Sequence, residues 1–149
     1  MAAPAYTWEF CQDLWGDRIP KIITLEAATG LYTKVGTLLA MASGQVRVAT
    51  DGDGEAIIGL AAQVIDVAAT AADPVKVAVL APGMVIKGTA DSDASGSTGF
   101  ASKTQDIDSD QRLDISATED VTGGFLSILR TEDAGLTVFC VVTDGALVA

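Results

Sequence analysis

Short apolar runs separated by turn-forming residues recur along the whole chain, and this pattern constrains it to β-structure. The clearest example spans residues 44–63, where Val46 and Val48 alternate with other residues and a second apolar run closes the segment. Between the two runs, residues 51–54 (Asp-Gly-Asp-Gly) are typical of a chain reversal, so the sequence predicts a hairpin. Gly59 in the second run predicts a bulge or a close approach of another backbone.

Further short strands are predicted on both sides of this hairpin. Their expected positions are residues 21–26, 35–41, 75–80, 84–87, 112–116, 125–130 and 137–143. The strand at 84–87 is expected to return after a Pro-Gly turn, and the last two strands are expected to pair. Alanine-rich residues 64–72 are expected to be strand and loop. Short strands at this spacing predict an all-β domain, a small sandwich or barrel.

Charge and composition restrict the function. The chain carries nine basic and twenty acidic residues, a net charge of −11, and no histidine. This balance argues against a nucleic-acid surface and against an anionic membrane, so we expect partners to be proteins or cations. Without histidine a Ser-His-Asp triad or a His-based metal site is excluded, and no Ser-x-x-Lys motif occurs. We therefore expect no enzyme activity and no cofactor.

The cysteines and the N-terminal sequence indicate the compartment. Cys11 and Cys140 lie near opposite ends of the chain, and we expect both to be free thiols. The N-terminus has no basic region followed by an apolar one, and no apolar stretch reaches the roughly 18 residues of a membrane span. We expect the protein to be made and kept in a cytosol-like compartment.

The first twenty residues differ from the rest, and we expect residues 1–20 to form an extended arm before a β-domain at 21–149. Half of the eight aromatic residues fall in the first fifteen positions: Tyr6, Trp8, Phe10 and Trp15. Tyr6, Trp8 and Phe10 alternate with polar residues. An extended arm would therefore project these three rings from one face, as in strand addition to a partner. The alternative is that they pack on the domain's own core. Residues 13–18 are expected to form a short helical turn.

A polar insert is predicted at residues 88–111, because this stretch has few large apolar residues and would add little to a core. Within it, Asp91, Asp93 and Ser95 fit the opening of an EF-hand loop, but Ser102 stands where the bidentate glutamate belongs. They remain weak candidates for a metal site. Two other acidic clusters, Asp51-Asp53-Glu55 and Asp106-Asp108-Asp110, lack the glycine of such loops. We expect turns and solubility, and no metal, in all three.

Three stretches of this sequence together resemble the head decoration, or capsid cement, proteins of tailed bacteriophages. They are residues 35–40 (Val-Gly-Thr-Leu-Leu-Ala), 44–52 (Gly-Gln-Val-Arg-Val-Ala-Thr-Asp-Gly) and 57–61 (Ile-Ile-Gly-Leu-Ala). In that family a strand, a hairpin and a strand of the form Ile-Ile-Gly-(Ile/Leu)-Ala recur in a small β-tulip-like domain. An acidic, alanine-rich, histidine-free chain with an arm before the domain is a second similarity. The resemblance covers residues 20–88.

The resemblance implies a virion structural protein that binds the outer surface of the expanded head, commonly as a homotrimer. Its partners would be the major capsid protein and further copies of itself, and it would reach the capsid surface after synthesis in the host cytoplasm. We infer from ring density that the capsid-binding anchors are Tyr6, Trp8, Phe10 and Trp15. The alternatives are a head-fibre base or other minor virion protein, with residues 88–111 as its tip, and a calcium-binding adhesion module.

Overall fold

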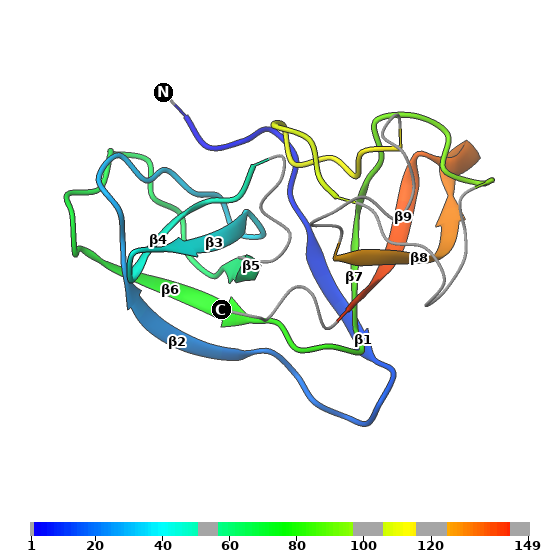
Figure 1. Cartoon of the computed structure of the whole chain (residues 1–149), viewed down its shortest axis with the longest axis horizontal. Helices are drawn as coiled ribbons and strands as arrows, with labels where there is room; N and C mark the ends of the chain where they lie inside the picture. The colour runs from blue at the N-terminus through cyan, green and yellow to red at the C-terminus, as the bar shows by residue number, and fades with distance from the viewer. Residues whose placement is uncertain (1, 51–56, 97–105, 116–124, 144–149) are drawn as a thin grey trace.

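The computed structural model describes residues 2–50, 57–96, 106–115 and 125–143 (Figure 1). In these ranges the chain forms nine strands and one short 3-10 turn. The strands are β1 (Glu9–Asp13), β2 (Lys21–Glu26), β3 (Leu38–Ala42), β4 (Gln45–Val48), β5 (Ile57–Ala61), β6 (Pro74–Val79), β7 (Met84–Thr89), β8 (Leu126–Glu132) and β9 (Thr137–Val142), and the turn is η2 (Asp133–Gly135). The predicted all-β fold is confirmed. Within the described ranges, no helix is long and apolar enough to cross a membrane.

The strands form two antiparallel sheets that pack as a small sandwich, seen side by side in Figure 1. One sheet has the order β1-β7-β9-β8 and the other the order β2-β6-β5-β3-β4. The second sheet curls on itself, because Ala27, just after β2, forms a bridge with Val46 of β4. The Ala28 N–H also donates to the Val46 carbonyl at 2.8 Å.

Alternation along the strands divides the apolar residues into separate cores. On β3, Leu38 and Ala40 belong to the cluster between the two sheets, with partners such as Ile86 and Ile128. Leu39 lies on the opposite face of the strand and belongs to a second cluster. Residues from the 27–33 and 64–73 segments cover that second cluster. The period-two pattern of the sequence therefore places one apolar layer on each face of the five-stranded sheet.

Four strand predictions and one glycine prediction are confirmed, and one of these strands is β6, which was predicted at 75–80. The strand predicted at 21–26 is β2, and the predicted closing pair is formed by β8 and β9. Gly59 of β5 lies so close to β6 that a Cβ there would meet the Ala78 carbonyl oxygen. The β3–β5 register also shifts between Leu39 and Ala40.

The hairpin predicted over residues 44–63 is wrong, because β4 and β5 do not pair. β3 lies between them and pairs with β4 on one edge and β5 on the other. The tight turn lies earlier, where Ser43 (φ 51°) and Gly44 (φ 79°) connect β3 to β4. Positive φ at both central residues is the geometry that joins antiparallel strands by a two-residue loop. The predicted reversal at 51–54 falls outside the described residues.

The strand predicted to return at 84–87 does not pair with its predecessor. β7 lies in the other sheet, between β1 and β9, so the turn at Gly83 carries the chain from one sheet to the other. Three further runs differ from prediction. β3 begins at Leu38 rather than at residue 35, residues 64–72 form no named strand, and Leu113 makes only isolated bridges.

The prediction that residues 88–111 add little to the core is wrong for the described part of that segment. Ala90, Ala94 and Ile107 are buried in the cluster between the sheets. Gln111 is fully buried. Its Oε1 accepts a hydrogen bond from the Leu38 N–H at 2.8 Å, and its Nε2 donates to the carbonyls of Leu38 (2.8 Å) and Ala49 (3.0 Å). Composition alone predicted that this segment faces solvent. A polar side chain can nevertheless be buried when its hydrogen bonds are all made within the protein.

Residues 9–13 of the predicted arm belong to the four-stranded sheet, since β1 pairs with β7 from Glu9 to Asp13. The indole Nε1 of Trp8 donates to the Gln111 carbonyl at 2.8 Å, which ties the N-terminal segment to the core. The predicted boundary at residue 20 therefore does not separate an arm from the β-domain. The predicted helical turn at 13–18 is a non-helical turn.

Candidate docking surface

An apolar loop connects β1 to β2 and passes beyond both sheets, at the bottom of Figure 1. We call residues 14–20 the docking loop. Apolar side chains are exposed along it and at the start of β2: Leu14 (39% exposed), Trp15 (64%), Ile19 (77%) and Ile22 (60%). Exposed large apolar side chains close together in the sequence make this segment a candidate for binding another molecule.

The Asp13 carboxylate fixes the conformation of the docking loop. Its Oδ1 accepts the Trp15 N–H at 3.1 Å, and its Oδ2 accepts the Arg18 N–H at 3.2 Å and pairs with Arg18 Nε at 2.6 Å. The hydrogen bond from the Arg18 side chain is the main reason that the pKa of Asp13 is lowered to about 2. The loop is therefore held by a network that needs the ionised carboxylate.

A second set of contacts holds the loop against the turn before β7. The Leu14 N–H donates to the Gly83 carbonyl at 2.9 Å, and Arg18 Nη2 donates to the Pro82 carbonyl at 2.8 Å. The Trp15 ring lies on Gly83, so that any Cβ at this position would meet the ring. Arg18 lies 5.9 Å from the centre of the same ring. Trp15 is thus held in one orientation, which would reduce the entropy lost if a partner bound to it.

The other three predicted anchors pack on their own domain. Trp8 is 2% exposed, and its ring fills the space that a side chain at Gly88 would need. Phe10 is half-buried and packs against the cluster between the sheets. Tyr6 is half-buried, with the Arg112 guanidinium 5.3 Å from its ring centre. For Trp8 and Phe10 the alternative of packing on the domain's own core therefore describes this structure.

Counting aromatic rings missed Ile19 and Ile22, which are as exposed as Trp15 or nearly so. Period-two alternation identified residues 6–10 as extended, but it could not indicate that the strand's partner is β7 of the same chain. A signal for the docking loop does exist in the sequence. Gly16 and Pro20 interrupt a run of apolar residues, so this run cannot continue a strand. Its apolar side chains are therefore expected to lie outside the sheet and to be exposed.

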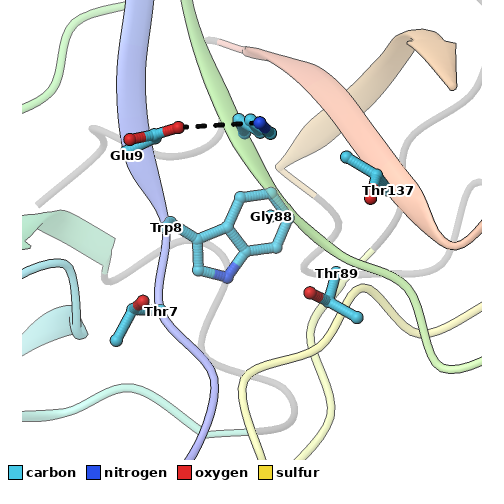
Figure 2. A pocket seen from close by; sticks show the side chains of 7 residues that line it. Thr7, Trp8, Glu9, Gly88, Thr89 and Thr137 are labelled. Atoms are coloured by element: carbon cyan, nitrogen blue, oxygen red, sulfur yellow. Dashed lines mark ion pairs between the residues drawn. The ribbon is translucent and has the colours of Figure 1, made fainter. Parts of the chain in front are cut away.

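A hollow of about 310 Å³ lies beside β1 and β7, lined by Thr7, Trp8, Glu9, Lys87, Gly88, Thr89 and Thr137 (Figure 2). Glu9 and Lys87 pair across it, with 3.9 Å between Oε1 and Nζ. Trp8 contributes almost no exposed ring. The opposite charges of this shallow site balance, and it presents no open aromatic face on which a ligand could stack.

The acidic side chains of the predicted metal candidates make hydrogen bonds or ion pairs within the protein. Asp93 Oδ1 accepts the Ser95 N–H at 2.9 Å, a bond that lowers the pKa of Asp93, and Asp91 Oδ1 accepts the Ile115 N–H at 2.9 Å. Asp108 pairs with Arg112 at 3.0 Å. In the described ranges, no cluster of three or more acidic, cysteine or histidine residues is placed to hold a metal ion. The cluster at residues 51–55 lies outside those ranges.

Both cysteines are free thiols, as predicted, with Cys11 exposed and Cys140 buried. Burial raises the pKa of Cys140 and, together with the charge of Glu9, that of Cys11.

Comparison with protein-family models finds no match for this chain, and comparison with curated proteins finds none either.

Proposed function

We propose that this protein is a capsid decoration protein that binds the outer surface of an expanded phage head, as a homotrimer, and stabilises contacts between major capsid subunits. The observation that carries the proposal is the pre-organised docking loop with its exposed Trp15. The sequence resemblance at residues 35–61 supports the family. The proposal replaces four aromatic anchors by one, Trp15, joined by Ile19 and Ile22.

The physical logic is selective binding to one state of the shell. A groove that forms only when the shell expands would bind the loop in the expanded lattice, and this differential affinity favours the mature state. Three loops on one trimer would raise the overall affinity through effective concentration, even if each contact is weak. The acidic body, with a net charge of −11 for the chain, would keep decorated particles apart.

The size of the Trp15 contribution follows from its exposed area. A tryptophan offers up to roughly 250 Å², so the 64% exposed part of Trp15 is about 160 Å². At about 25 cal/mol per Å² its complete burial would contribute about 4 kcal/mol per loop. Truncation to alanine should cost about 2 to 3 kcal/mol, which is roughly a 30- to 150-fold loss of affinity.

The test is co-sedimentation of the full chain with expanded and with precursor heads of its source particle. Truncation of residues 1–19 is unsuitable, because it removes β1 and the buried Trp8. We therefore use Trp15→Ala, and as a matched control Val67→Ala, which trims an apolar side chain that is 77% exposed away from the docking loop.

We expect saturable binding to expanded heads, little binding to precursors, a large loss in Trp15→Ala and none in Val67→Ala. Binding by wild type that Trp15→Ala leaves intact would move the contact away from the docking loop. No binding of wild type would reject the decoration role. Saturation at only a few copies per head would favour a head-fibre base or another minor virion role.

A further inference from the structure

β2 is an outer strand of the five-stranded sheet, and one of its edges pairs with β6 over its whole length. The opposite edge meets β4 only at the end of β2, where Ala28 donates to Val46 and Ala27 forms a bridge with the same residue. Around Ile22 and Thr24, no described strand adjoins this edge.

The hydrogen bonds of β6 fix which main-chain groups of β2 face the open edge. The Ala62 N–H donates to the main-chain carbonyl of Lys76, and the Leu80 N–H donates to the carbonyl of Ile58. The even-numbered residues of β6 therefore form their main-chain hydrogen bonds with β5. The odd-numbered residues of β6 therefore bond to β2, where their register partners are Lys21, Ile23 and Leu25. By alternation, the N–H and C=O groups of Ile22 and Thr24 point away from β6.

These main-chain groups belong to two exposed residues. The side chains of Ile22 and Thr24 are exposed, and their N–H and C=O groups have no hydrogen-bond partner among the described residues. Ile19 lies next to them in sequence and is 77% exposed. An open strand edge flanked by exposed apolar side chains is the surface to which an extended peptide adds.

We propose that the β2 edge binds an extended segment of a basic partner protein by strand addition. The segment would bond to the main chain of Ile22 and Thr24 and place an apolar side chain beside Ile22. The partner is assigned by charge, since the net charge of −11 attracts lysine and arginine side chains. The proposed capsid contact uses the side chains of Trp15, Ile19 and Ile22, whereas this proposal assigns a binding role to the main-chain groups of β2, and in this respect it goes beyond the proposed function.

The test uses the full chain and a designed peptide, Lys-Val-Thr-Val-Thr-Val-Lys, with Glu-Val-Thr-Val-Thr-Val-Glu as its acidic twin. In Thr24→Pro the edge loses an N–H, and the ring obstructs the approach of a strand, but the bonds to β6 stay. Thr24→Val is the matched control, because it changes the side chain and keeps the N–H. Binding is followed by calorimetry at low ionic strength.

We expect saturable binding of the basic peptide to wild type and Thr24→Val, with at least tenfold weaker binding to Thr24→Pro. Amide exchange of wild type should slow at Ile22 and Thr24 when the basic peptide is added, a result that does not depend on the folding of any variant. Absence of saturable binding, or unchanged exchange at both amides, overturns the proposal. Equal binding of the acidic twin overturns the assignment by charge. A wild-type dimer that Thr24→Pro abolishes would identify a second copy as the occupant and overturn the proposed partner.

Discussion

Replacement of Gln111 by methionine should strongly destabilise the fold, although the two side chains have similar size. The Gln111 amide makes three hydrogen bonds, to the N–H and C=O of Leu38 and to the C=O of Ala49. Gln111 is fully buried, so water cannot replace the lost bonds. The substitution thus leaves one N–H and two carbonyls of the main chain without these partners.

The magnitude follows from those groups. A buried donor or acceptor left without a partner costs about 1 to 3 kcal/mol, and the N–H of Leu38 is the most sensitive because it has a single bond to make. Carbonyl oxygens accept elsewhere more readily, so we expect a total loss of about 3 to 4 kcal/mol for Gln111→Met. A domain is stable by only about 5 to 15 kcal/mol, so this is a large fraction.

The assay is urea unfolding followed by tryptophan fluorescence, with the free energy extrapolated to water. Gln12→Met is the matched control, because Gln12 is exposed on β1 and the same substitution there should change the free energy by less than about 0.5 kcal/mol. A loss below about 1 kcal/mol for Gln111→Met would refute the reasoning, since it would mean that the three bonds contribute little to stability.

Three further predictions concern the docking loop and the thiols. The folded-state pKa of Asp13, about 2, lies below its ordinary value of 3.8, so the loop network is complete above pH 3.8 and is lost as the pH falls through about 2. Quenching of Trp15 fluorescence by acrylamide should therefore rise in wild type as the pH falls from 3.8 to about 2. Asp13→Asn should show high quenching already at neutral pH. Gly83→Ala should destabilise the fold by roughly 1 to 2 kcal/mol more than Gly30→Ala in urea unfolding, because both glycines have positive φ (91° and 84°) but only Gly83 faces the Trp15 ring; equal losses would show that the ring gives way freely. A thiol reagent should modify Cys11 alone in the native protein and both cysteines in urea, and rapid native modification of Cys140 would contradict its burial.

The sequence by itself determined the strand content and the chemistry that the chain lacks. The short run of β-branched and apolar residues at 21–26 predicted β2 to the residue, because such residues favour a strand wherever it lies in the fold. Gly59 predicted a close backbone approach, because only the absence of a Cβ permits one. The absence of histidine excludes histidine-based sites whatever fold the chain adopts.

Only the tertiary structure decided which strands pair and which rings are free. Alternation gives each strand its faces but not its neighbours, so β3 could lie between β4 and β5 without any local signal. Trp8 and Trp15 are the same residue type seven positions apart, yet one is 2% and the other 64% exposed. The difference arises from partners that are distant in sequence, Gln111 and Gly88 for Trp8 and Gly83 for Trp15, which come together only when the chain folds and β1 pairs with β7.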